Sequence, residues 1–116
     1  MKNFQILGMM SGSSLDGIDL AICTFSLDND LDTPIRSWQF EQVATLVYPN
    51  EWKEKLQNLQ ADNLAHLFQL DRLLGIFYGH LIKGFLAKKP TIDAIAIHGH
   101  TIIHQPEEGF SLQLGS

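Results

Sequence analysis

Residues 8–19 (GMMSGSSLDGID) combine three glycines, three serines and two aspartates between two apolar runs. Glycine lets the backbone adopt positive φ and approach a ligand closely, while serine hydroxyls and free N–H groups donate hydrogen bonds to anionic oxygens. Asp16 and Asp19 add carboxylates of the kind that orient a hydrated magnesium ion. The segment therefore predicts a phosphate-binding hairpin, and the alternative is a tight hairpin whose polar side chains only satisfy the turn.

Two other phosphate-binding motifs do not fit this segment. Gly12 and Gly17 have the spacing of a Walker A loop, but Ile18 and Asp19 stand where that loop needs Lys and then Ser or Thr. The Gly-x-Gly-x-x-Gly pattern of dinucleotide-binding folds does not occur either. A hairpin between two antiparallel strands remains as the phosphate-binding interpretation.

A second polar segment, residues 98–106 (HGHTIIHQP), directly follows the apolar run 92–97. Ligands of α/β sheets bind beyond the carboxyl ends of the strands, so we expect a loop beside a binding cleft. If this segment stayed extended, the imidazoles of His98, His100 and His104 would lie on one side of it, where they could bind zinc. Gly99 and Pro106 indicate a turn instead, and no cysteine or carboxylate is fixed nearby, so we predict no metal bound by this segment.

Periodicity predicts a mixed α/β fold with the element order βββαβ. Three antiparallel strands are expected over residues 4–9, 17–25 and 38–48, with a turn at 28–34, and then helices over 52–59 and 62–88. The second strand is apolar on both faces, which predicts that both are covered. In the third, Trp38, Phe40, Ala44, Leu46 and Tyr48 are expected to share one face. Asp62 is a candidate cap for the long helix, whose expected apolar stripe is Leu67, Leu70, Leu74, Phe77, Leu81 and Phe85. The run 92–97 should form a buried strand parallel to one of the first three, because a helical crossover precedes it, and 110–114 should form a last short strand.

Composition limits the class of partner. The chain has 116 residues, enough for one domain, and its formal net charge of −5 argues against nucleic acid and anionic membranes as partners. The single cysteine, Cys23, excludes an internal disulfide. Neither a secretory leader nor a membrane-spanning apolar stretch is evident, so we expect a cytoplasmic protein that binds a small polar metabolite.

The two polar segments resemble the two signatures of the anhydro-N-acetylmuramic acid kinases. The first match is 8–19, and the second is 98–106 together with 112–115 (LQLG). Two departures occur: Ser13 replaces the usual threonine and keeps its hydroxyl, and His100 stands where the family usually has glutamine. The resemblance implies the ribonuclease H-like fold that actin, Hsp70 and sugar kinases share.

The resemblance also implies an activity. These kinases use ATP and Mg²⁺ to phosphorylate the 6-oxygen of 1,6-anhydro-N-acetylmuramic acid while water opens the anhydro bridge, which gives N-acetylmuramic acid 6-phosphate in peptidoglycan recycling. The ATP phosphates would lie against Gly12, Ser13, Ser14, Leu15, Asp16, Gly17, Ile18 and Asp19. The amino sugar would contact His98, Gly99, His100 and Thr101.

Family members are much longer chains, and their catalytic aspartate and adenosine-binding glycines would lie beyond Ser116. We therefore expect residues 1–116 to form a single, incomplete N-terminal lobe of a two-lobe kinase, inactive by itself. Exposed apolar surface and a homodimer are then expected. The alternative is a non-catalytic module of the same fold that binds a nucleotide or a sugar.

Overall fold

The computed structural model describes residues 2–12, 15, 17–27, 35–59, 63–87 and 92–115. Its strands are β1 (Lys2–Ser11), β2 (Ile18–Leu27), β3 (Ile35–Leu46), β4 (Ala94–Gln105) and β5 (Phe110–Leu114). Its helices are α1 (Asn50–Gln57), α2 (Leu64–Phe85) and the short 3₁₀ helix η1 (Pro106–Glu108). The turn predicted at 28–34 lies outside the described residues.

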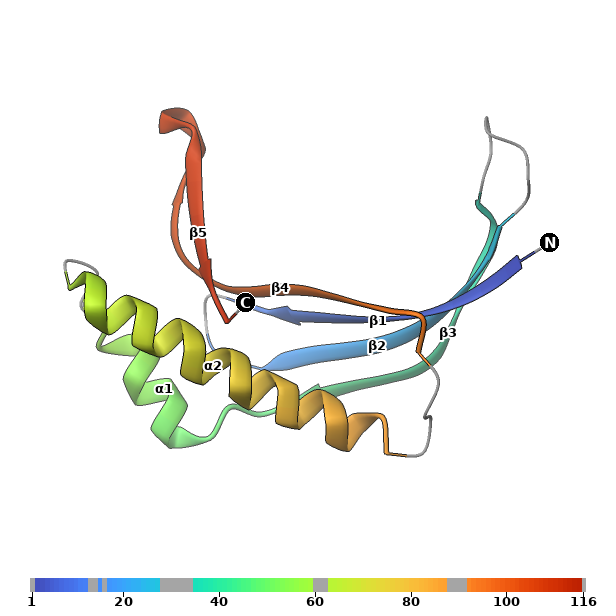
Figure 1. Ribbon diagram of the computed structural model, residues 1–116, viewed down its shortest axis with the longest axis horizontal. Coiled ribbons are helices and arrows are strands. Elements are labelled where there is room, and N and C mark those ends of the chain that lie inside the picture. Colours follow the sequence, from blue (N-terminus) through green and yellow to red (C-terminus); the bar gives the residue numbers. More distant parts are fainter. Residues whose placement is uncertain are drawn as a thin grey trace.

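The strands form one mixed sheet in the order β3-β2-β1-β4-β5 (Figure 1). β1, β2 and β3 are antiparallel neighbours, and β4 returns parallel to β1 after the two helices. The predicted meander and the predicted parallel fourth strand are therefore confirmed. This order places β1 at the centre of the sheet, with its carboxyl end between β2 and β4.

Both helices lie on the same side of the sheet (Figure 1). Alternate residues of β1 and β2 are buried beneath them: Leu7, Met9, Ile18, Leu20 and Ile22. The same core contains Trp52 and Leu74 from the helices and Tyr48 from the connection between β3 and α1. The prediction that both faces of β2 are covered is wrong for the described residues, because no described helix lies on the opposite face.

A bulge in β3 corrects the predicted face of its aromatic side chains. Ile22 pairs with Gln42, but its neighbour Cys23 pairs with Phe40, so the strand shifts its alternation at Glu41. Trp38 and Phe40 consequently lie on the uncovered face, where more than half of each side chain is exposed. Ala44, Leu46 and Tyr48 remain on the helix side, as predicted.

The long helix begins after Asn63, whose side chain accepts a hydrogen bond from the N–H of His66 at 3.1 Å. Asn63 rather than Asp62 is therefore the cap, and Asp62 itself lies outside the described residues. In the first half of α2, the buried residues are those of the predicted stripe. In the second half, the buried residues are Tyr78 and Ile82 instead. The remaining predicted stripe residues, Phe77, Leu81 and Phe85, pack against the core while partly buried.

β4 does not end where the sequence predicts. It continues through the expected loop to Gln105, because its second half pairs with β5 from His100↔Leu114 to Gln105↔Phe110. Gly99 allows this at a register shift: its φ is +77°, and an added Cβ would lie 2.6 Å from the carbonyl oxygen of Leu114. The β4–β5 hairpin thus bends away from the plane of the sheet (Figure 1).

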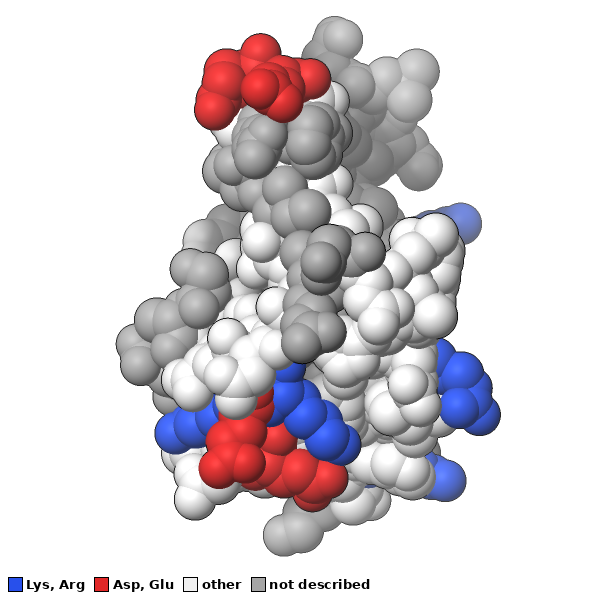
Figure 2. Space-filling model, turned by 90° about the vertical axis from the view of Figure 1, so that its left-hand side faces the viewer, with Lys and Arg blue, Asp and Glu red and all other residues white. Residues whose placement is uncertain are grey.

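The described residues beside this hairpin are mostly uncharged in Figure 2. Acidic side chains lie at the tip, where η1 contains Glu107 and Glu108, and acidic and basic side chains adjoin at the opposite end of the same view. Neither described helix has the length and apolarity needed to span a bilayer.

Candidate functional site

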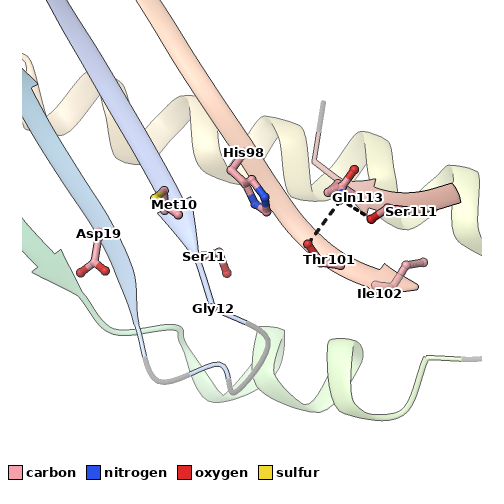
Figure 3. A pocket seen from close by; sticks show the side chains of 9 residues that line it. All are labelled: Met10, Ser11, Gly12, Asp19, His98, Thr101, Ile102, Ser111 and Gln113. Atoms are coloured by element: carbon pink, nitrogen blue, oxygen red, sulfur yellow. Dashed lines mark hydrogen bonds between the residues drawn. The ribbon is translucent and has the colours of Figure 1, made fainter. Parts of the chain in front are cut away.

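An open cavity of about 840 Å³ lies where β1 ends and the β4–β5 hairpin bends away (Figure 3). This volume is in the range of small-molecule sites. Its lining comes from four strands and includes Met10, Ser11, Gly12, Asp19, His98, Thr101, Ile102, Ser111 and Gln113. The cavity therefore brings the two polar segments of the sequence to one place.

The predicted phosphate hairpin contributes Gly12 and Asp19 to this cavity. Its tip contains a turn in which the N–H of Leu15 donates to the carbonyl oxygen of Gly12 at 3.1 Å. The side chains of Leu15, which has a φ of +60°, and Ile18 are buried in the core. These two residues thus have only backbone groups to offer a ligand, and the predicted contacts of Ser13, Ser14 and Asp16 lie outside the described residues.

The Asp19 carboxylate is oriented by β3. The hydroxyl of Thr45 donates to Asp19 Oδ1 at 2.6 Å, which leaves the other carboxylate oxygen of this cavity-lining residue available as an acceptor. Gly17 makes this approach possible, because a Cβ there would lie 2.8 Å from Thr45 Cγ2. Glycine is therefore needed at this position because the hairpin packs closely against β3.

Of the second predicted segment, His98 and Thr101 line the cavity. His98 Nδ1 lies 3.4 Å from the carbonyl oxygen of Gly99, whose own backbone packs against β5. His100 is buried on the helix side of the sheet and does not line the cavity. The structure thus separates neighbours that the sequence grouped together.

β5 contributes polar groups that were not among the predicted site residues. Gln113 Nε2 donates to Ser111 Oγ at 2.7 Å and to Thr101 Oγ1 at 3.5 Å (Figure 3). Both side chains lie on the face that Thr101 occupies, because Thr101 pairs with Gln113 across the hairpin. The alternating pattern of 110–114 indicated one polar face but not that it adjoined the cavity.

His100 belongs to a buried polar cluster that adjoins the cavity through Ser11. Ser11 Oγ lies 3.3 Å from His100 Nδ1 and also hydrogen-bonds the hydroxyl of Tyr48. Burial lowers the pKa of His100 below its ordinary value, which favours the neutral imidazole. No sequence pattern indicated that Tyr48 would meet the ends of β1 and β4.

The described cavity wall offers a metal ion few ligands from the protein itself. Within the part of the chain that the structure describes, no group of three His, Cys, Asp or Glu side chains is placed to hold a metal ion. Mg²⁺ in phosphoryl-transfer sites keeps several waters and takes its other ligands from phosphate and one or two carboxylates. Asp19, on the cavity wall, fits that limited role.

Comparison with known proteins adds to this geometry. The family model described as anhydro-N-acetylmuramic acid kinase matches residues 4–116. The chain belongs to the anhydro-N-acetylmuramic acid kinase family. Its five-stranded mixed sheet with two helices is consistent with the N-terminal lobe of the ribonuclease H-like kinase fold.

Individual members of this family align along nearly the whole chain. The anhydro-N-acetylmuramic acid kinase of Sulfurimonas denitrificans is 36% identical over all of this chain and 31% of its own length. The Haemophilus influenzae enzyme of the same name is 37% identical over 99% of this chain and 30% of its own. The one from Paramagnetospirillum magneticum is 33% identical over 94% and 30%. The chain thus spans about a third of the length of these relatives.

Proposed function

We propose that a protein carrying this chain phosphorylates 1,6-anhydro-N-acetylmuramic acid in cytoplasmic peptidoglycan recycling. The γ-phosphoryl group of ATP goes to the 6-oxygen of the sugar, and water opens the anhydro bridge. The products are N-acetylmuramic acid 6-phosphate and ADP. The main support is that one cavity joins Gly12 and Asp19 to His98 and Thr101, in a chain of the kinase family.

ATP supplies the phosphoryl group, and Mg²⁺ neutralises charge on the phosphates. The backbone at Gly12, at the end of β1, can approach an anionic oxygen closely because no side chain intervenes. Asp19 has a fixed orientation through Thr45 and is an acceptor for a metal-bound water or a sugar hydroxyl. These residues bind and orient the phosphate side of the reaction.

The opposite wall is suited to a polar sugar. His98 and Thr101 from β4 and Gln113 from β5 present imidazole, hydroxyl and amide groups, which can donate to and accept from sugar hydroxyls and an acetamido group. The cavity wall also contains Met10 and Ile102, which offer apolar contact to a sugar ring. The catalytic base is expected in a part of the protein that follows this chain.

The proposal is tested with the complete protein, ATP and 1,6-anhydro-N-acetylmuramic acid. ADP release and the phosphorylated sugar are measured, the latter by mass spectrometry. Asp19→Asn should lower kcat/KM about 100-fold, because the oriented carboxylate is lost. Glu51→Gln removes an equal charge from an exposed position on α1 and should stay within about twofold of the parent.

Two results would contradict this function. ATP binding with no turnover of this sugar by the complete protein would favour the non-catalytic module. Equal losses of kcat/KM in Asp19→Asn and Glu51→Gln would show that the cavity does not take part in the reaction.

A further inference from the structure

The side chain of Thr45 lies outside both polar segments, yet it contacts the predicted phosphate hairpin at two points. Its hydroxyl donates to Asp19 Oδ1 at 2.6 Å. Its methyl group lies over Gly17, where an added Cβ would come within 2.8 Å of Thr45 Cγ2. One side chain of β3 therefore touches the residues on either side of Ile18, with which β2 begins.

The register of the sheet sets this contact. Asp19 pairs with Thr45 in the antiparallel β2–β3 ladder. The neighbours of Asp19 along β2, Ile18 and Leu20, are buried beneath the helices. Asp19 and Thr45 therefore share the opposite face of the sheet, where both are exposed. Threonine is branched at Cβ, so the position of its methyl group over Gly17 also fixes the direction of its hydroxyl.

Asp19 has few other constraints on its side chain. Within the part of the chain that the structure describes, no second group hydrogen-bonds its carboxylate. Asp19 lines the cavity (Figure 3) and also a second hollow of about 460 Å³ along β3, so open space adjoins it on two sides. An exposed carboxylate with this freedom would occupy several rotamers. The Thr45 hydroxyl favours one of them and leaves one oxygen as a free acceptor.

We propose that Thr45 is a positioning residue of the candidate site: its methyl group packs over Gly17, and its hydroxyl holds the Asp19 carboxylate in one orientation for the phosphate side of the reaction. The cavity itself is lined by β1, β2, β4 and β5, so this assignment adds β3 to the strands that build the site. The effect of Thr45 on turnover rests on the proposed function, whereas its effect on the Asp19 orientation does not.

A second pair in the same two strands provides a matched control. Thr24 Oγ1 donates to Glu41 Oε1 at 2.9 Å, and neither of these described residues lines the cavity. Cross-strand pairs of this kind add little to the stability of a sheet. Thr24→Val therefore reports the effect of losing an exposed threonine hydroxyl from β2 and β3 without any change at the site.

Crystal structures of the complete protein test the orientation and require no activity. Thr45→Val keeps the shape of the side chain and removes its hydroxyl. The Asp19 carboxylate should leave its parent orientation, or occupy more than one, in Thr45→Val. It should keep the parent orientation in Thr45→Ser and in Thr24→Val. An unchanged Asp19 orientation in Thr45→Val would overturn the proposal.

The second experiment measures sugar phosphorylation by the complete protein. Thr45→Val should lower kcat/KM about 10-fold, because the Asp19 carboxylate is present but misplaced. Thr45→Ser and Thr24→Val should stay within about threefold of the parent. In an Asp19→Ala background, Thr45→Val should cause no further loss, because no carboxylate is left to position.

The result of this cycle separates positioning from a structural role. Thermal denaturation must show that each variant remains folded. A loss of kcat/KM in Thr45→Val that persists undiminished in the Asp19→Ala background would reject the positioning role. An equal loss in Thr24→Val would reject it as well.

The contact at Gly17 allows a suppressor test. Gly17→Ala places a Cβ against Thr45 Cγ2 and should turn the hydroxyl away from Asp19, which lowers kcat/KM about 10-fold. Thr45→Ser removes that methyl group, so adding it to Gly17→Ala should raise kcat/KM about threefold. The recovery is partial because the same Cβ lies 3.3 Å from the carbonyl oxygen of Leu46. An absence of recovery would overturn the role of the Gly17 contact.

Failure of the proposed function is distinguishable from failure of this inference. If the parent does not phosphorylate the sugar, only the proposed function fails. The crystal structures then still decide whether Thr45 holds the Asp19 carboxylate.

Discussion

At the residue scale, neighbours in the two polar segments face opposite sides of the sheet. Asp19 lines the cavity while Ile18 is fully buried, and Thr101 lines it while His100 is buried. Strand geometry causes this alternation, so a motif read as a continuous string overstates the number of side chains that can touch a ligand. The sequence could predict which segments form the site. Which side chains can contact a ligand depends on the side of the sheet that each residue faces.

The first prediction concerns the pH dependence of stability. The pKa of His100 is lowered in the folded state by burial, so the unfolded chain binds a proton more readily. The stabilisation of the neutral imidazole is present above the ordinary pKa of about 6.5 and decreases as pH falls from there toward the lowered value. Urea denaturation between pH 7.5 and 5 should therefore show the parent losing more stability than His100→Asn. Parallel losses in the two proteins would show that His100 is not responsible.

At the element scale, strands and helices followed from periodicity, and errors occurred where long-range pairing decides the end or the phase of a strand. The bulge at Glu41 reverses the faces of Trp38 and Phe40, and the only trace of it in the sequence is Gln42, which interrupts the apolar alternation. Likewise, β4 continues past Gly99 because β5 is available as a partner. Local propensity contains neither piece of information, since both depend on residues distant along the chain.

The second prediction tests the role of Gly99 in the β4–β5 pairing. Gly99→Ala places a methyl group in a positive-φ position and 2.6 Å from the Leu114 carbonyl oxygen. Gly109→Ala is a matched control, because its φ is +87° but no atom lies within 4 Å of the added Cβ. The control should cost about 1 kcal/mol of unfolding free energy from backbone strain alone. Gly99→Ala should cost about 2–4 kcal/mol, because overpacking adds to that strain.

Amide hydrogen exchange gives the corresponding local measurement. Gly99→Ala should lower protection across the His100↔Leu114 register, whereas Gly109→Ala should leave it near the parent level. Equal effects of the two substitutions would show that positive φ, rather than the contact with β5, explains the requirement for glycine.

At the scale of the whole molecule, one face of the sheet is covered by helices and the other is not (Figure 1). Trp38 and Phe40 pack edge-to-face on the uncovered side, with ring centroids 5.4 Å apart, and Val43 is 63% exposed on the same strand. Exposed apolar side chains gathered on one face in this way favour association. The chain also spans only about a third of the length of its relatives, whose remaining residues are available to cover such a face.

The last prediction is that residues 1–116, prepared alone, self-associate through this uncovered face. Sedimentation velocity should show a concentration-dependent increase in mass, because burying the two aromatic side chains removes apolar surface from water. Phe40→Glu should reduce this association, since a charge would have to be buried in the contact. Ile76→Glu is the matched control: Ile76 is 46% exposed on α2, on the helix side of the sheet, and its replacement should leave association unchanged. If both variants weaken association equally, general hydrophobicity rather than the uncovered face is the cause, and a monomer at all concentrations would reject the predicted contact.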